Sequence, residues 1–197
     1  MTKVTICHRI PLWHIFCSNR TNPKTIKMKE NKNITSREGA PLTLLGDMVS
    51  VGMQAPDFTA YDNQMKEVHL SDFKGKKVVI SVFPSIDTPV CASQTRTFNK
   101  KAAALGDDTV VISISKDLPF ALGRFCAAEG IDRNYTLSDY RSGGFALKYG
   151  FLIKEMELLG RGVVIVDKNG KVAYVEYLDD IVKEPDYDKA LAVLEKL

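Results

Sequence analysis

The chain has 197 residues, of which 45% are hydrophobic and 26% are charged, and its formal net charge is +3 at pH 7. This length and composition suit one soluble globular domain with a full core, and the small positive excess, without a basic cluster or interleaved aromatic residues beyond the N-terminal segment, argues against a nucleic-acid partner. No apolar run approaches the roughly 18 residues that a membrane-spanning helix needs, so we expect no membrane partner.

The first 30 residues differ from the rest of the chain. They hold the single Trp, two of the three His residues and two of the four Cys residues, without hydrophobic periodicity. We interpret residues 1–30 as a disordered extension or a mis-assigned start, and residues 31–197 as a single domain. Export is not expected, because the short apolar stretch of this leader carries Pro11 and His14 and lacks a clear cleavage site. We therefore expect a cytoplasmic protein.

Cysteine is used sparingly. Cys7 and Cys17 lie in the leader, whereas Cys91 and Cys126 lie in the domain. Such usage argues against a secreted disulfide scaffold and favours a selective, redox use of thiols. The cysteines and histidines of the leader fit no structural zinc spacing, so no metal site is expected.

In chain order, the predicted elements begin near Pro41. The segments Pro41–Leu45 and Glu67–Leu70 favour two short strands or an N-terminal hairpin. The run Val78–Phe83 is short, continuous and rich in β-branched residues, as expected of a strand that is buried on both faces. A second buried strand is predicted over Thr109–Ile114, and the helical pattern between the two completes a βαβ unit.

The second half of the domain is predicted to contain helices and one hairpin. Asp117 is expected to cap a helix that contains Cys126, and a shorter helix is expected over Gly144–Tyr149. Asn169-Gly170 separates two apolar runs, which predicts an antiparallel hairpin, and a last helix is predicted over Tyr187–Leu197. This order predicts an α/β, thioredoxin-like fold: a central mixed β-sheet flanked by helices, with an N-terminal hairpin.

The most informative segment runs from Pro84 to Cys91. Thr88 is a favourable N-cap and Pro89 suits the first helical position, which places Cys91 in the first turn of the helix. Unpaired backbone N–H groups and the helix dipole favour an anion there, so the thiolate form of Cys91 is stabilised relative to the thiol. Because Gln94 stands three residues after Cys91, dithiol exchange by a Cys-x-x-Cys motif is excluded.

A single cysteine preceded by Pro-x-x-x-Thr-x-x resembles the signature of the peroxiredoxins. Four further segments make the chain similar to their thiol peroxidase branch, the atypical two-cysteine peroxiredoxins. These segments are Asp117-Leu-Pro-Phe120, Arg124-Phe-Cys126, Gly160-Arg161 before an apolar strand, and Glu184-Pro-Asp-Tyr187. The resemblance runs from about residue 41 to the C-terminus and implies a thioredoxin-like fold.

This resemblance also implies roles for individual residues. Cys91 is the peroxidatic cysteine, which attacks a hydroperoxide and becomes a sulfenic acid as water or an alcohol departs. Thr88 orients the peroxide, Pro84 shields the nucleophile from water, and Arg161 stabilises the thiolate and donates to the peroxide. Cys126 is the resolving cysteine, which gives an intramolecular Cys91–Cys126 disulfide. The cysteines fall on two different predicted helices, and a disulfide needs Cα atoms within about 7 Å, so we expect local unwinding.

By the same resemblance, the substrates are hydrogen peroxide and organic (alkyl or lipid) hydroperoxides, thioredoxin is the reductant, the protein is a homodimer and no bound cofactor is required. The role would be antioxidant defence and redox homeostasis. An alternative is a peroxide-sensing relay protein, which would pass its oxidation to a specific partner and turn over negligibly with thioredoxin. The alternative for Cys126, which lies among apolar neighbours, is a plain core cysteine, and without the resemblance Arg161 would be interpreted as a surface charge.

Overall fold

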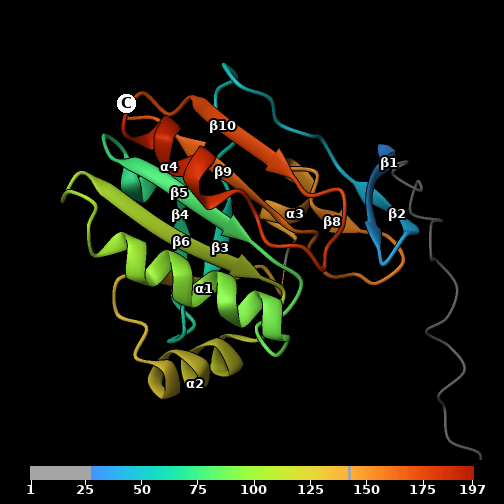
Figure 1. Ribbon diagram of the computed structural model, residues 1–197, viewed down its shortest axis with the longest axis horizontal. Coiled ribbons are helices and arrows are strands. Elements are labelled where there is room, and N and C mark those ends of the chain that lie inside the picture. Colours follow the sequence, from blue (N-terminus) through green and yellow to red (C-terminus); the bar gives the residue numbers. More distant parts are fainter. Residues whose placement is uncertain (1–27, 142) are drawn as a thin grey trace, which may run out of the picture.

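The computed structural model describes residues 28–141 and 143–197 (Figure 1). Within these residues a seven-stranded sheet has the order β10-β9-β5-β6-β7-β3-β4, and a three-stranded sheet has the order β1-β2-β8. The elements are β1 (Glu30–Arg37), β2 (Ala40–Leu45), β3 (Thr59–Tyr61), β4 (Glu67–His69), the 3₁₀ helix η1 (Leu70–Phe73), β5 (Lys77–Val82), α1 (Pro89–Ala102), β6 (Thr109–Ser115), α2 (Pro119–Glu129), β7 (Tyr135–Ser138), α3 (Gly144–Lys148), β8 (Leu152–Ile153), β9 (Gly162–Val166), β10 (Val172–Tyr177) and α4 (Tyr187–Leu194).

A βαβ unit forms the centre of the large sheet, as the sequence predicts. β5 and β6 are parallel and in register from Lys77 opposite Thr109 to Val82 opposite Ile114. Their side chains are almost all buried, which explains why both strands appear in the sequence as continuous apolar runs. Helix α1 connects them, so the segment between β5 and α1 lies at the carboxyl edge of the sheet.

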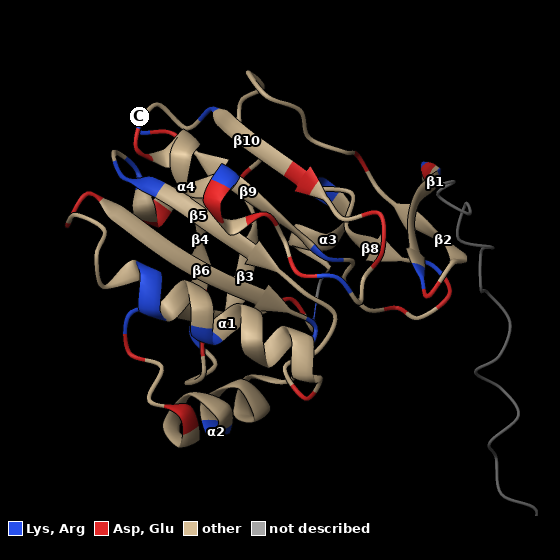
Figure 2. Cartoon of the chain, in the orientation of Figure 1, with Lys and Arg blue, Asp and Glu red and all other residues tan. Residues whose placement is uncertain are grey.

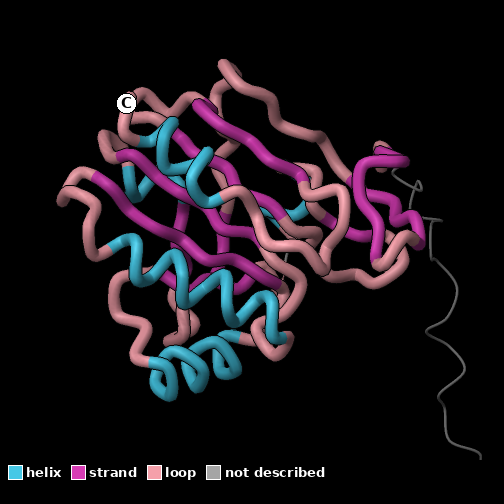
Figure 3. The backbone as a smooth tube through the Cα atoms, viewed as in Figure 1, coloured by secondary structure: helices cyan, strands magenta, loops and turns pink. Residues whose placement is uncertain are grey.

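Helices cover both faces of this sheet. α1 and α4 pack together on one face, where Phe98 and Leu194 contact the odd-numbered residues of β5 and β9, and these two helices lie in front of the strands in Figure 3. α3 packs on the opposite face, where Phe145 joins the even-numbered residues of the same strands. Alternate side chains of a strand point to opposite faces, so each central strand contributes to two separate cores.

The hairpin of β9 and β10 is confirmed. The strands are antiparallel, with Val172 opposite Val166 and Tyr177 opposite Gly162. The Asp167 carboxylate accepts hydrogen bonds from the backbone N–H groups of Asn169 (2.9 Å) and Lys171 (2.8 Å), which fixes the tight turn.

Compact structure begins earlier than the predicted start near Pro41. β1 pairs antiparallel with β2, from Glu30 opposite Leu45 to Arg37 opposite Ala40, and makes an N-terminal hairpin. The segments predicted as two short strands or a hairpin correspond to β2 and β4, which lie in different sheets and do not pair with each other. β1 is polar and mostly exposed, so its ladder of backbone hydrogen bonds holds it in place and hydrophobic periodicity could not reveal it. The predictions for the leader fall mainly on residues 1–27, which lie outside the described residues.

Two predicted helix ends are wrong. Asp117 does not cap α2: Pro119 is the first helical residue, which makes Leu118 the N-cap, and the Asp117 carboxylate binds other donors instead. The last helix, α4, ends at Leu194, because the residues beyond it are exposed and have no core to pack against. At its start, the Asp186 carboxylate caps α4 by accepting from the N–H of Lys189 at 2.9 Å.

The charged side chains of the described residues are mixed over the surface, with acidic and basic groups close together on most elements (Figure 2). None of the helices described for this chain is long and apolar enough to cross a membrane.

Gly46 offers a test of the packing between the end of β2 and helix α3. It has φ +104°, and a Cβ there would lie 2.7 Å from the Leu147 Cα, whereas Gly39 has φ +83° and open space around it. We expect Gly39→Ala to cost about 1 kcal/mol of unfolding free energy from backbone strain alone. Gly46→Ala should cost about 1–3 kcal/mol more because of the clash. Urea unfolding measures both, and equal losses would contradict the close approach.

Candidate functional site

Cys91 lies where the sequence places it, in the first turn of α1. Thr88 is the N-cap residue and Pro89 the first helical residue. The Cys91 side chain is fully buried and lies in an apolar cluster with Phe83, Ile86 and Leu122. Its sulfur is therefore at a helix N-terminus, where backbone N–H groups and the helix dipole favour negative charge.

Two hydrogen-bond donors converge on the Cys91 sulfur. The Thr88 Oγ1 hydroxyl donates to Sγ at 2.8 Å, and the Arg161 Nη2 group donates to it at 3.1 Å. Arg161 directly precedes β9, whose first residue, Gly162, pairs with Val82 at the end of β5. This antiparallel pairing brings a residue 70 positions away along the chain to the thiol. A cation and a hydroxyl on one sulfur stabilise the thiolate.

The Arg161 side chain is only 3% exposed, and its guanidinium is held on every branch. Nε donates to the backbone oxygen of Ile181 at 2.7 Å, and Nη1 donates to Gln94 Oε1 at 2.5 Å. Gln94 in turn donates from Nε2 to Ser81 Oγ at 2.7 Å and to the Val82 carbonyl at 3.3 Å. The Arg161 guanidinium is therefore fixed in orientation. Arg161 is a buried residue and not a surface charge.

Sequence reasoning missed Gln94 and Ser81 as parts of this site. In the sequence, Gln94 only shows that no second cysteine stands three residues after Cys91. A detectable signal existed, because both are polar residues at positions that the helical and strand periodicities assign to the interior. Buried polar side chains are normally hydrogen-bonded to something specific.

Thr88 and Pro84 also lie beside Cys91. Thr88 is exposed and occupies the N-cap with φ −102° and ψ 144°, but its side chain does not cap the helix. Its hydroxyl oxygen is within hydrogen-bond distance of two acceptors, the Cys91 sulfur at 2.8 Å and the Ser85 carbonyl oxygen at 3.1 Å. Pro84 is buried in the segment between β5 and α1. Both residues belong to the same short loop as the cysteine.

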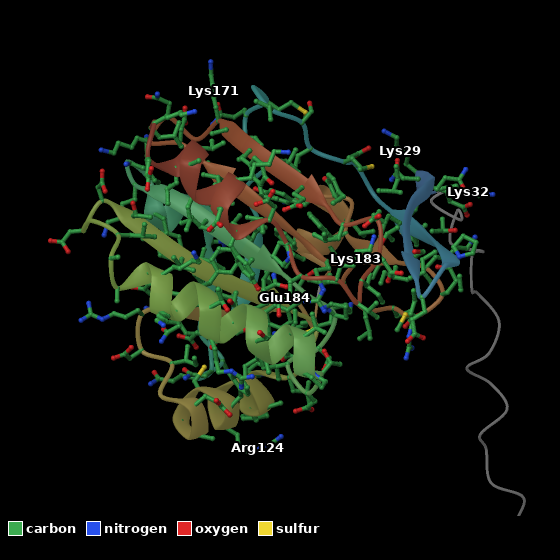
Figure 4. The ribbon with its side chains drawn as sticks, viewed as in Figure 1. Lys29, Lys32, Arg124, Lys171, Lys183 and Glu184 are labelled. Carbon is green, nitrogen blue, oxygen red and sulfur yellow. The ribbon has the colours of Figure 1, made fainter. Side chains whose placement is uncertain are left out.

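Cys126 lies on α2, and its thiol is free, as is that of Cys91. Its Sγ is 3.2 Å from Thr136 Oγ1 on β7, and burial raises the pKa of the Cys126 thiol. Leu122, one turn earlier on α2, belongs to the apolar cluster around Cys91. The structure thus brings α2 against the Cys91 pocket, while the two thiols have different partners. Arg124 is exposed and points away from the molecule (Figure 4).

The Redoxin family matches residues 50–191 of the chain. Over 164 residues, 83% of this chain and 99% of the relative, the sequence is 52% identical to a thiol peroxidase of Oceanobacillus iheyensis. It is 51% identical over 160 residues to a thiol peroxidase of Bacillus subtilis, covering 81% of this chain and 95% of that protein. The chain belongs to the thiol peroxidases of the Redoxin family.

Solved structures agree with this membership. A peroxiredoxin-like protein from Aquifex aeolicus has a TM-score of 0.78 and 36% identity, over 86% of this thiol peroxidase and 99% of the Aquifex chain. A thiol peroxidase from Chromobacterium violaceum is similar in fold, with a TM-score of 0.74 and 22% identity over 82% of this chain and 95% of its own. The predicted thioredoxin-like peroxiredoxin fold is confirmed.

The Gln94 contacts lead to a stability test. In Gln94→Met the Arg161 Nη1 group and the Ser81 hydroxyl lose their hydrogen-bond partner inside the protein. A buried polar group left without a partner costs about 1–3 kcal/mol, so the unfolding free energy should fall by at least that amount. Gln64→Met, at an exposed turn position, is the control and should change it by less than about 0.5 kcal/mol. Urea unfolding that gave the same value for both variants would contradict the buried network.

Proposed function

We propose that Cys91 is the peroxidatic cysteine of this thiol peroxidase and that Cys126 is its resolving cysteine. The family performs thiol-based reduction of peroxides, and the chain is an oxidoreductase of that kind. The observation that carries the assignment of Cys91 is the pair of donors on its sulfur, Thr88 Oγ1 at 2.8 Å and Arg161 Nη2 at 3.1 Å. We expect hydrogen peroxide and organic hydroperoxides as substrates.

In the first step the Cys91 thiolate attacks the terminal oxygen of the hydroperoxide. A sulfur–oxygen bond forms, the oxygen–oxygen bond breaks, and the leaving oxygen takes a proton and departs as water or an alcohol. Negative charge moves from the sulfur to the peroxide oxygens during the attack. Donors fixed beside the sulfur are close enough to stabilise this charge as it develops on the oxygens. Arg161 and Thr88 supply these donors, and the buried Pro84 limits access of water.

In the second step the Cys126 thiolate attacks the sulfur of the Cys91 sulfenic acid. The Cys91–Cys126 disulfide forms, and hydroxide leaves as water after taking a proton. Since the Cys91 and Cys126 thiols have separate partners on α1 and α2, we expect both the loop before α1 and helix α2 to open locally. Helix α2 buries only Pro119 and Leu122 and contains Gly123, so it is the more weakly held element. A segment with few buried side chains opens at low free-energy cost.

Recycling needs a dithiol reductant, for which thioredoxin is the proposed protein. Its thiolate would attack the disulfide, and a second thiol would release the reduced peroxidase. A cytoplasmic location and a homodimer are further proposals that rest on the resemblance of the sequence to its family.

Cysteine variants test the assignment. We expect Cys91→Ser to reduce peroxide-dependent consumption of reductant to the uncatalysed rate. Cys126→Ser should still react with one equivalent of peroxide and then stop, with a sulfenic acid on Cys91 that dimedone labels. After one equivalent of peroxide, mass spectrometry of the unmodified protein should find a Cys91–Cys126 link within one chain. A link between chains, or one to Cys7 or Cys17, would overturn the role of Cys126.

The same assay separates the relay alternative. A peroxidase turns over repeatedly with thioredoxin, whereas a relay protein would oxidise once and form a mixed disulfide with a specific client. Negligible turnover with thioredoxin, together with rapid oxidation of Cys91, would favour the relay.

The pH dependence of the second step follows from the environment of Cys126. Burial raises the pKa of this thiol, while its hydrogen bond with Thr136 lowers it. The nucleophilic thiolate is thus a minor form at neutral pH, and the rate of disulfide formation should rise as the pH increases toward that pKa. Thr136→Val should move the rise to higher pH, because the stabilising hydrogen bond is lost. Thr35→Val is the control, since Thr35 Oγ1 is buried without a hydrogen-bond partner in the described structure. Rapid-mixing measurements that gave a pH-independent rate would contradict this ionisation.

A further inference from the structure

Asp117, which does not cap α2, has its carboxylate in the loop that carries the catalytic residues. Oδ1 accepts from the Ser85 hydroxyl at 2.7 Å, and Oδ2 accepts from the backbone N–H of Ile86, also at 2.7 Å. Oδ2 also accepts from the Ser115 hydroxyl at 2.7 Å. Hydrogen bonds to a charged acceptor are among the stronger ones in proteins. One carboxylate thus ties the loop between β5 and α1 to the end of β6.

We propose that Asp117 is a positioning residue that holds the loop from Pro84 to Thr88 in the conformation for peroxide attack, and that it must release this loop before the disulfide forms. The inference rests on the proposed function of Cys91 and Cys126. It assigns to Asp117 an opposite effect on the two steps, favouring the first and opposing the second.

The first half of the inference follows from the contacts of Ser85. The Ser85 carbonyl oxygen accepts from the Thr88 N–H and from the Thr88 hydroxyl, both at 3.1 Å. The Thr88 hydroxyl has one proton and two acceptors in reach, the Ser85 oxygen and the Cys91 sulfur at 2.8 Å. By fixing Ser85 and Ile86, Asp117 fixes the place of Thr88 without touching the substrate.

The second half follows from the position of Asp117 directly before α2. Its backbone N–H donates to Ser115 Oγ at 3.2 Å, and its carbonyl oxygen accepts from the Ser138 hydroxyl. The residue is therefore anchored to β6 and β7 on the side that leads to Cys126. If Cys91 and its loop move to meet Cys126, the bonds from Ser85 and Ile86 to this anchored carboxylate have to break.

A competing reaction makes this release measurable. Two reactions compete for the Cys91 sulfenic acid. In one, the Cys126 thiolate attacks its sulfur, the disulfide forms, and hydroxide is displaced and leaves as water after taking a proton. In the other, the sulfenic acid attacks a second hydroperoxide and becomes a sulfinic acid as water or an alcohol leaves. The first route needs the loop to open, whereas the second needs it to stay closed around the donors. A tighter loop thus raises the yield of sulfinic acid at high peroxide concentration.

The test is Asp117→Asn, which keeps one acceptor oxygen and replaces the other by an amide group that cannot accept. Stopped-flow kinetics should show a slower oxidation of Cys91, by about tenfold for one lost charge-assisted hydrogen bond. Mass spectrometry should show a higher ratio of disulfide to sulfinic acid than in the unmodified protein. If both steps slow together, or if neither changes, the inference is wrong.

Two further variants keep the test specific. Ser85→Ala removes one donor to Asp117 and should cause the same pair of opposite changes, and its effect should be less than additive with that of Asp117→Asn. Asp167→Asn weakens an equivalent carboxylate in the β9–β10 turn and should alter neither step. Opposite changes in this control as well would assign the effect to general destabilisation.

The unmodified protein separates this inference from the proposed function. If peroxide does not oxidise Cys91 or no Cys91–Cys126 disulfide forms, the proposed function fails. If both occur and Asp117→Asn behaves like the unmodified protein, only the role of Asp117 fails.

Discussion

A buried guanidinium in contact with a buried thiol is the interaction on which the site depends. Arg161 is 3% exposed, and among the described residues no carboxylate forms a salt bridge with it. Its donors go to the Ile181 carbonyl, the Gln94 side-chain oxygen and the Cys91 sulfur. A buried charge is costly unless it is compensated, and the sulfur is the one of these partners that can become an anion. The same contact therefore compensates the positive charge and stabilises the thiolate of the proposed nucleophile.

The fold sets this contact at an edge where several elements end. β5 is followed by the loop that carries Pro84 and Thr88 and then by α1. β9 pairs with β5, so Arg161 lies beside the end of β5. The polar side chains of Ser81 and Gln94 are buried beside Arg161, and their hydrogen bonds fix the orientation of the guanidinium. Rigidity around Cys91 suits the attack on peroxide, because preorganised donors need no rearrangement as charge develops.

The proposed Cys91–Cys126 disulfide needs the opposite property, a region that opens easily. The proposed partner Cys126 lies on a short helix with little buried surface, and its thiol contacts Thr136 of β7. A tightly packed site next to a weakly anchored helix gives two regions of different local stability in one small domain. Asp117 stands at the junction of these regions, with its side chain on the loop and its backbone at the start of α2.

The sequence by itself determined the elements whose signals are local. Continuous β-branched runs fixed β5 and β6, Asn169-Gly170 fixed the β9–β10 hairpin, and Thr88-Pro89 placed Cys91 in the first turn of its helix. Local signals failed where distant partners decide. β1 is held by backbone pairing with β2 and by side-chain hydrogen bonds to other segments, and the Asp117 carboxylate binds the donors of the Ser85–Ile86 loop instead of the N-terminus of α2. Only the tertiary structure brought Arg161 and Gln94 to the sulfur, because strand register and burial depend on contacts between segments far apart in the chain, which no local pattern encodes.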